Sequence, residues 1–266
     1  MNETLLRALT GSVYVAVVLV ASFFQLSYLV LFGLFLVVAI WEFCQLVSLP
    51  STSALALGIA TYAVFGLFSF SENTEWLVLL FTLAVSIRAT SYMFNSSPFP
   101  LSTNTKIIYL IGYIVLPFVL LAKIPTINHV YDAWAVILVF ILIWANDTFA
   151  YLVGKTWGKH KLLERISPKK TREGFVGGLL GSLVIAGIFS QYVDSLELIS
   201  SLLLAVLVCV GSTIGDLIES KFKRVANVKD SGKLLPGHGG VLDRLDSIIF
   251  VAPLAFLFYK IIAHVS

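Results

Sequence analysis

The sequence predicts an all-α, polytopic integral membrane protein with about nine transmembrane helices and a polar site that faces the cytoplasm. Of its 266 residues, 58% are hydrophobic and only 12% are charged, and the mean hydropathy is +0.94. This charge fraction is about half that of a typical soluble domain, too low to provide a polar shell. Apolar runs of about 20 residues, the length that crosses a bilayer, recur from end to end. The charged residues that do occur gather in two loops.

The apolar runs and the residues that interrupt them give the order of the spans. The predicted spans are residues 8–24, 26–47, 54–70, 76–94, 106–123, 132–153, 174–192, 197–218 and 246–264. Pro117 and Pro253 lie inside spans and predict kinks, which membrane helices tolerate. We expect a single membrane domain over residues 1–266, with N-terminal helices in 1–100 and catalytic helices and two basic loops in 101–266.

The distribution of Lys and Arg predicts the orientation. Residues 155–172 hold seven of the 18 basic side chains, and residues 221–244 hold another six. Two spans separate these loops, so they lie on the same side of the membrane. The positive-inside rule places both in the cytoplasm. The expected location is therefore the cytoplasmic (inner) membrane of the cell, with multiple passes and a cytoplasm-facing site.

The stretch from Ser220 to Asp246 lies between two predicted spans and is crowded with charge. Ionisable groups beside the hydrocarbon mark functional sites by default. At the end of the preceding span, one polar stripe recurs at helical spacing. The stripe consists of Asp216, Glu219, Ser220, Lys223 and Arg224. Such a stripe must face protein or a water-filled cavity rather than lipid.

Asp216 and Asp246 flank this loop and are candidate ligands for a magnesium ion. Mg²⁺ favours oxygen ligands, usually one or two carboxylates completed by water and substrate phosphates. Asp243 lies one helical turn before Asp246. The alternative is that these acids only form ion pairs with neighbouring basic residues, and the spacing alone leaves the two interpretations open.

Between these acids, Pro236-Gly-His-Gly-Gly240 forms a glycine-rich segment. Glycines let backbone N–H groups approach a ligand closely and form an anion-binding concavity. A simple turn between two helices is the alternative interpretation. His238 is either a donor to a phosphate or a structural hydrogen-bonding residue.

A second polar element runs from Asp147 to Glu173. Asp147 falls near the cytoplasmic end of its span, at the predicted depth of Asp216 and Asp246. The short connection Ser167-Pro-Lys-Lys-Thr-Arg offers cations and hydroxyls that suit a triphosphate, or alternatively anchor the loop at the membrane surface. Gly154-Lys155-Thr156 resembles the end of a phosphate-binding P-loop, but Phe149 occupies the required glycine position, so we reject that interpretation.

Four polar or thiol residues lie within apolar spans. Glu42 and Arg88 are costly to bury without partners, so we expect each to have a polar partner that the sequence does not identify. The two cysteines, Cys44 and Cys209, lack the spacing of a metal site or a redox pair and are expected to be free thiols.

The stretch from Ser220 to Asp246 resembles the signature of the phosphatidate cytidylyltransferase (CDP-diacylglycerol synthase) family. The matching residues are Ser220, Lys223-Arg224, Lys229-Asp230, Gly232, Pro236, His238-Gly239-Gly240 and Asp243-Arg244-Leu245-Asp246. The resemblance extends to Trp41-Glu42, to Asp147-Thr-Phe-Ala-Tyr151 and to the basic loop, whereas the N-terminal third matches mainly in hydrophobicity.

The resemblance implies an enzyme that transfers the cytidylyl group of CTP to phosphatidic acid, giving CDP-diacylglycerol and pyrophosphate in phospholipid biosynthesis. It implies Mg²⁺ as cofactor, leaves a monovalent cation (K⁺) open as a second ion, and suggests a homodimer in contact with membrane lipid. Nucleic acid is not an expected partner. The expected roles are as follows: Asp216 and Asp246 bind metal; Asp243, Lys223, Arg224, Ser220 and His238 are catalytic; and Asp147, Lys169, Lys170, Thr171 and Lys229 bind the nucleotide.

Two other classes of protein remain open. A CTP-dependent polyprenol kinase would share the many spans but would release CDP rather than pyrophosphate. A transporter would use the embedded charges as a path, but such sites usually lie near the midplane between repeats. Here the charges gather at one face, and the sequence shows no repeat.

Overall fold

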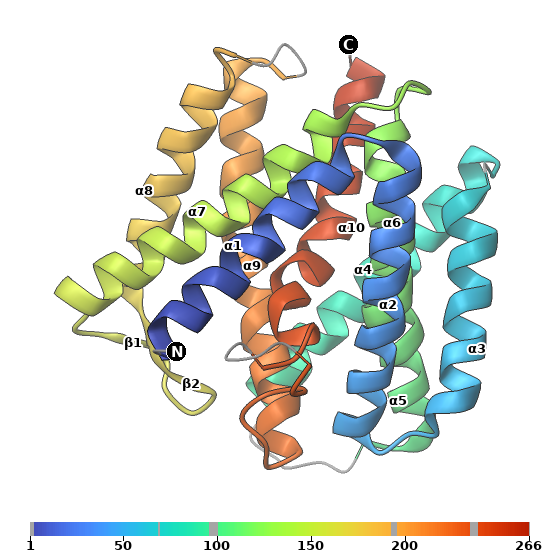
Figure 1. Cartoon of the computed structure of the whole chain (residues 1–266), viewed down its shortest axis with the longest axis horizontal. Coiled ribbons are helices and arrows are strands. Elements are labelled where there is room, and N and C mark those ends of the chain that lie inside the picture. The colour runs from blue at the N-terminus through green and yellow to red at the C-terminus, as the bar shows by residue number, and fades with distance from the viewer. Residues whose placement is uncertain (1–2, 69, 96–100, 193–195, 235–238, 266) are drawn as a thin grey trace.

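The computed structural model describes residues 3–68, 70–95, 101–192, 196–234 and 239–265. The chain folds into a bundle of helices with one short β-hairpin at one end (Figure 1). The elements are α1 (Glu3–Ser22), α2 (Gln25–Val47), α3 (Ser51–Thr61), η1 (Tyr62–Gly66), α4 (Glu72–Phe94), α5 (Thr103–Tyr109), η2 (Leu110–Val115), α6 (Leu116–Lys123), η3 (Ile124–Thr126), α7 (Ala133–Trp157), β1 (Lys161–Leu163), β2 (Ser167–Thr171), α8 (Arg172–Phe189), α9 (Leu198–Val225) and α10 (Leu242–Val265).

The helices have the length and composition of a multi-pass membrane protein. Within the described residues, seven are long and apolar enough to cross a bilayer. They are Gln25–Val47, Glu72–Phe94, Thr103–Thr126, Ala133–Trp157, Arg172–Phe189, Leu198–Val225 and Leu242–His264. Two of the predicted spans, 8–24 and 54–70, coincide with shorter apolar helices, Leu9–Ser22 and Ser51–Gly66. The predicted helical, multi-pass class is confirmed, with seven helices that meet the criteria for a span.

The hairpin is an element that the all-α prediction missed. Strands β1 and β2 pair antiparallel, with Lys161 opposite Thr171 and Leu163 opposite Ser167. The strands are only three and five residues long, too short to show an alternating pattern in so basic a segment.

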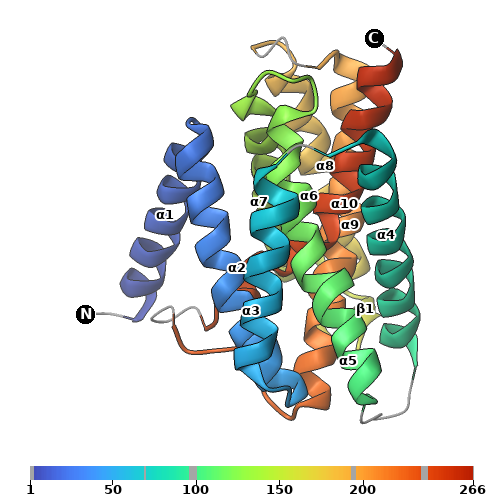
Figure 2. The same cartoon turned by 90° about the vertical axis from the view of Figure 1, so that its right-hand side faces the viewer.

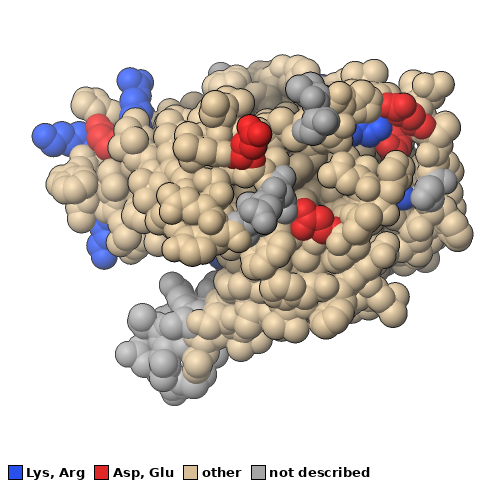
Figure 3. Space-filling view, turned by 90° about the horizontal axis from the view of Figure 1, so that it is seen from above, with Lys and Arg blue, Asp and Glu red and all other residues tan. Residues whose placement is uncertain are grey.

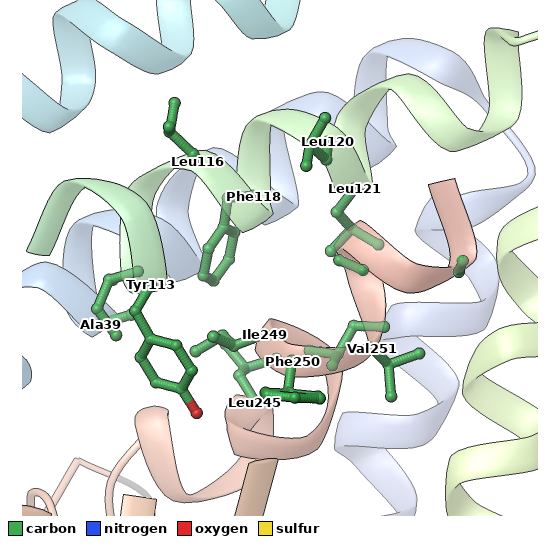
Figure 4. Packing of buried hydrophobic residues seen from close by; sticks show 14 of the residues in the cluster. Ala39, Tyr113, Leu116, Phe118, Leu120, Leu121, Leu245, Ile249, Phe250 and Val251 are labelled. Carbon is green, nitrogen blue, oxygen red and sulfur yellow. The ribbon is translucent and has the colours of Figure 1, made fainter. Parts of the chain in front are cut away.

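The centre of the bundle is formed by α10 and the α5–α6 region. Side chains of α6 and η2, including Phe118 and Tyr113, pack against Ile249 and Phe250 of α10 (Figure 4). The π-helical turns of η2 end just before Pro117. Because proline has no N–H to donate and disturbs the preceding turn, this irregularity lies where the sequence predicts a kink.

Helices α7 and α8 pack through glycines of α8. A Cβ atom at Gly178 would lie 2.4 Å from the Asn146 side-chain oxygen, and one at Gly181 would lie 2.2 Å from the Phe149 ring. Small residues of this kind allow two membrane helices to approach closely. The side chain of Thr171 caps the start of α8 by accepting a hydrogen bond from the Gly174 N–H at 3.1 Å.

The two ends of the bundle differ in charge. The hairpin, the end of α9 and the start of α10 lie together at one end, which we call the hairpin end (Figure 1). The opposite end, seen in Figure 3, shows mainly uncharged residues with scattered acids, and with Lys or Arg at the left-hand edge of the view and beside acids at the right. There the Lys260 ammonium of α10 lies 2.8 Å from the Glu75 carboxylate of α4. Both basic segments of the sequence therefore lie at one end of the bundle.

Candidate active site

A cavity of about 600 Å³ lies at the hairpin end between α7, α8, α9 and the hairpin. Four lysines contribute to its wall, and two aspartates lie among them. Its lining residues include Lys155, Lys161, Lys169, Lys170, Thr171, Asn146, Asp147, Tyr151 and Asp216. A cavity with this many ammonium groups is suited to a polyanion, because the positive potential of a concave wall concentrates anionic ligands.

Strand β2 and helix α9 meet in this cavity through one ion pair. The Lys170 ammonium lies 2.5 Å from the Asp216 carboxylate. Burial alone would lower the pKa of Lys170, but the neighbouring carboxylates of Asp216, Asp147 and Asp246 outweigh it, and the pKa lies above its ordinary value. Lys170 is therefore a permanent cation at neutral pH.

Three aspartates from three different helices gather around Lys170. Asp147 of α7, Asp216 of α9 and Asp246 of α10 interact electrostatically with one another and with the lysine. Asp147 also lines a second cavity of about 320 Å³, which reaches Asp246 between α1, α7 and α10. The carboxylates thus separate two cavities.

The aspartates provide oxygen atoms of the type that Mg²⁺ requires. Within the described residues, no group of three or more His, Cys, Asp or Glu side chains is arranged to hold a metal ion. The ammonium of Lys170 nevertheless shows that a cation is stabilised at Asp216. Two carboxylates with substrate phosphates and water match the usual magnesium site, so Asp216 and Asp246 have the chemistry of magnesium ligands.

The polar stripe predicted on α9 divides between two environments. Ser220 donates a hydrogen bond to Asp216 Oδ1 at 3.2 Å, on the side of the larger cavity. Lys223 is buried and forms ion pairs with Glu219 and Asp243, and its ammonium lies 2.5 Å from Asp243 Oδ1. In this structure the positive charge of Lys223 is therefore paired with carboxylates of the protein itself.

Asp243 connects the loop after α9 to the start of α10. Its Oδ2 atom accepts hydrogen bonds from the Ser231 N–H at 2.9 Å, the Ser231 hydroxyl at 3.0 Å and the Gly240 N–H at 2.8 Å. Gly239 has a φ of +84°, a conformation that favours glycine. Asp243 thus ties Ser231 and Gly240 to the start of α10.

The partner of Glu42 is the same loop. Glu42 is fully buried, and its carboxylate accepts hydrogen bonds from the Val241 N–H at 3.1 Å and the Leu242 N–H at 2.7 Å. The Ser231 hydroxyl donates a third at 3.0 Å. An acid at the N-terminus of a helix is stabilised by the helix dipole, so α2 fixes the start of α10. The other embedded charge, Arg88, interacts with the hydroxyl of Tyr109.

The structure brings together some of the sequence-predicted site residues and separates others. Those around the larger cavity are Asp147, Lys169, Lys170, Thr171, Asp216 and, through its hydrogen bond, Ser220. Arg224 donates to the backbone carbonyls of Ile166 and Val228. Lys229 is exposed on the loop and is not among the residues that line either cavity. His238 and Pro236 lie outside the described residues.

Several basic residues of the two loops serve a structural purpose. Arg165 donates hydrogen bonds to the carbonyls of Met93, Phe94 and Asn95, and Lys221 donates to the carbonyl of Asn95 at 2.9 Å. Cations stabilise the carbonyl end of a helix. Both loops therefore tether the end of α4 to the hairpin end of the bundle.

The sequence interpretation assigned no site role to four residues that line the cavities. Lys155, Lys161 and Asn146 line the larger one, and Arg244 lines the smaller one. Lys155 appeared in a rejected P-loop resemblance, Lys161 in a basic segment and Arg244 in the family signature, whereas Asn146 directly precedes Asp147. Asn146 donates hydrogen bonds to the Ser212 hydroxyl at 3.0 Å and to Asp147 Oδ1 at 3.3 Å. The position of Asn146 next to Asp147 was the only sequence signal that it belongs to the site.

A family model described as "Cytidylyltransferase family" matches residues 5–262 of this chain. The chain belongs to the cytidylyltransferase family. The match includes all three aspartates and the lysine-lined wall, as well as α1 and α2, where the sequence resemblance was weakest.

Individual relatives of this cytidylyltransferase family member carry a more specific name. Proteins named phosphatidate cytidylyltransferase from Staphylococcus haemolyticus and Staphylococcus aureus (strain COL) are each 50% identical over 116 residues, 43% of this chain. One from Staphylococcus saprophyticus is 48% identical over 120 residues, 45% of this chain. The chain covers 45, 45 and 46% of the length of these three relatives.

Proposed function

We propose that this cytidylyltransferase family member transfers the cytidylyl group of CTP to phosphatidic acid, giving CDP-diacylglycerol and pyrophosphate. The observation that carries the proposal is the lysine-lined cavity of about 600 Å³ that ends on Asp147 and Asp216 at the end of an apolar helical bundle. A soluble triphosphate and a lipid can meet only where such a polar site lies beside a bilayer. The names of the staphylococcal relatives support the choice of substrates.

The lysines provide the binding energy for the triphosphate. Lys155, Lys161 and Lys169 are exposed around the cavity, where each ammonium neutralises phosphate charge as a flexible point charge. Lys170 is held against Asp216 and orders the wall. In phosphoryl and nucleotidyl transfer the protein acts mainly by positioning reactants and stabilising charge.

The reaction needs one bond to form and one to break. A phosphate oxygen of phosphatidate attacks the α-phosphorus of CTP, and the bond from that phosphorus to the bridging oxygen breaks as pyrophosphate leaves. The attacking phosphate is already largely ionised near neutral pH, so no dedicated general base is required. The reaction involves no oxidation or reduction.

Asp216 and Asp246 are the residues that we assign to Mg²⁺, with Asp147 on the nucleotide side. When bound, the ion would neutralise charge on the triphosphate and the leaving pyrophosphate. Ser220 orients Asp216 through its hydrogen bond, and Lys223 holds Asp243. Ser220, Lys223 and Asp243 thus act as positioning residues for the carboxylates of the proposed metal site. A monovalent cation such as K⁺ is proposed as a second ion on the family resemblance alone.

We further propose nine membrane crossings in which both basic segments face the cytoplasm across the inner membrane. The two shorter apolar helices would complete the nine, and the clustering of both basic segments at the hairpin end supports one orientation. A homodimer is proposed from the family resemblance, and chemical crosslinking of the purified protein in detergent tests it.

The test of the proposed function is the product formed by purified protein. Incubation with α-³²P-labelled CTP, phosphatidic acid and Mg²⁺ should transfer label into a chloroform-soluble nucleotide lipid and release unlabelled pyrophosphate. A polyprenol kinase would instead leave the label in soluble CDP. If folded protein forms no labelled lipid under these conditions, the proposal is refuted.

A further inference from the structure

The second cavity, of about 320 Å³, has a wall that comes from the N-terminal helix. Four residues of α1, namely Thr10, Gly11, Tyr14 and Val15, line it. Their spacing of i, i+1, i+4 and i+5 places them on one helical face. The other walls come from α7 and α10, and they end on Asp147 and Asp246. A segment far away in the sequence therefore completes a cavity at the carboxylates.

The two cavities differ in the charge that they offer. The larger contains four lysines and two aspartates, whereas the residues that line the smaller include one cation, Arg244, and three aspartates, Asp147, Asp243 and Asp246. The Arg244 charge interacts with Asp147. Apolar surface from Val15, Ile143 and Trp144 accompanies hydroxyls of Thr10, Thr148 and Ser247. One cation with hydroxyls and apolar walls suits a single phosphate attached to a glycerol and acyl chains better than a triphosphate, whose larger negative charge the three carboxylates would repel more strongly.

The outer face of α1 points away from the protein. Val13, Val17 and Val20 are exposed by 60, 44 and 64%, as expected for side chains in contact with acyl chains. Helix α1 is also at the edge of the bundle (Figure 2). The smaller cavity is thus separated from the surrounding lipid by the width of one helix.

Contacts across the cavity hold α1 close to Arg244. The Tyr14 hydroxyl donates a hydrogen bond to the Arg244 backbone carbonyl at 3.4 Å. The rings of Tyr14 and Trp144 meet edge to face, with centroids 6.4 Å apart. Tyr14 therefore joins all three helices that form the cavity.

We propose that the smaller cavity binds the phosphate and glycerol of the lipid substrate, and that α1 is the wall of this subsite on the lipid side. The proposal rests on the proposed function for the identity of the lipid, a phosphomonoester of diacylglycerol. Because Asp147 lines both cavities, the lipid phosphate and CTP approach the carboxylates from opposite sides. Helix α1 then contributes to the choice of lipid.

Kinetics in mixed micelles test this role of α1. Gly11→Leu adds a side chain on the cavity face, and Val13→Leu is the matched control on the lipid face. Gly11→Leu should raise the apparent KM for phosphatidate at least about five-fold and leave that for CTP within about two-fold. Val13→Leu should change neither. An equal rise in both constants, or no rise for phosphatidate, contradicts the proposal.

A second experiment needs no turnover and covers the case in which Gly11→Leu does not fold. Thr10→Cys, in a background lacking Cys44 and Cys209, is alkylated in detergent with and without each probe. Phosphatidate should slow alkylation at least about three-fold at a concentration where glycerol 3-phosphate and inorganic phosphate have no effect. Ser12→Cys, which is exposed on the other face of α1, should be unaffected by all three.

The outcomes of the second experiment separate the two proposals. Protection by phosphatidate in a protein that makes no nucleotide lipid supports the cavity as a lipid-phosphate site and refutes the proposed reaction. Equal protection by glycerol 3-phosphate or inorganic phosphate refutes the lipid subsite. Protection of Thr10→Cys by CTP rather than by phosphatidate reverses the assignment of the two cavities and also refutes it.

Discussion

The ammonium of Lys170 lies 2.5 Å from the carboxylate of Asp216 and joins the hairpin to α9 across the larger cavity. The lysine comes from a basic loop and the aspartate from the middle of the chain's longest helix. Both residues line that cavity, so the contact joins two of its walls. It also makes the hairpin part of the site.

Replacing Asp216 or Asp246 with Asn should reduce turnover to below about a tenth of wild type, because each change removes half of the proposed magnesium ligand pair. The protein should still insert and show an unchanged elution profile in detergent. Initial rates measured across a range of Mg²⁺ concentrations check the prediction. Full activity of both variants at saturating Mg²⁺ would remove these residues from the metal site.

Lys161→Ala and Lys169→Ala should each raise the KM for CTP several-fold, by about 1 kcal/mol per lost charge contact, with little change in the KM for phosphatidate. Lys159→Ala is the matched control, because Lys159 is an exposed neighbour that is not among the cavity-lining residues. Steady-state kinetics with each substrate varied in turn measure both constants. A larger effect on phosphatidate than on CTP would assign the hairpin to the lipid side.

Glu42→Ala should destabilise the protein by about 3 kcal/mol, because it leaves the N–H groups of Val241 and Leu242 buried without their acceptor. Activity should fall with stability, since the loop that carries Asp243 loses its anchor. Glu72→Ala, in which an exposed acid is changed, is the control. Thermal unfolding in detergent is the measurement, and equal melting temperatures for both variants would contradict the prediction.

The contribution of the Lys170–Asp216 pair to stability should persist at alkaline pH. The pKa of Lys170 is raised above its ordinary value by Asp216 despite burial. Its ammonium therefore stabilises the fold below about pH 10.4, and the contribution is lost only as the pH rises through the raised pKa. The difference in melting temperature between wild type and Lys170→Met should be constant from about pH 7 to about pH 10. A difference that disappears by about pH 8.5 would show a pKa lowered below the ordinary value of a lysine.

The proposed orientation is tested with single cysteines in a background that lacks Cys44 and Cys209. Lys161→Cys and Lys229→Cys, both at exposed positions, should resist an impermeant thiol reagent in intact cells and react after permeabilisation. Asn73→Cys, exposed at the opposite end of the bundle, should react in intact cells. Reaction of Lys229→Cys from outside would reverse the orientation and remove the route by which CTP reaches the lysines.

The sequence was sufficient to predict the helical class and to group Asp147, Lys169, Lys170 and Asp216 at one site. An apolar run long enough to cross a bilayer predicts a helix by its length and composition. The family resemblance covered the motifs that contain these four residues. The hairpin was not predicted, since its strands are short and gain their order from packing. The cavity wall from α1 was not predicted either, because contacts between distant segments leave no local pattern.

The stripe on α9 shows why residue spacing did not settle individual roles. Side chains at i, i+3 and i+4 share a face that is broad enough to meet two environments. Asp216 lines the larger cavity and Ser220 hydrogen-bonds to it, whereas Glu219 and Lys223 point into the protein toward Asp243. Similarly, Glu42 was recognised as a residue that needs a partner, but that partner lies about 200 positions away.

The glycines of α8 determine the width of the larger cavity because they have no side chains. Any side chain at Gly178 or Gly181 would occupy space now filled by Asn146 or Phe149, so α7 and α8 would have to separate. Asp147 and Lys155 on α7 would then move away from Lys170 and Thr171 of β2, which directly precede α8. The reach of the lysines toward a bound anion thus depends on residues that touch no ligand, and substitutions there should weaken nucleotide binding without altering a single charge.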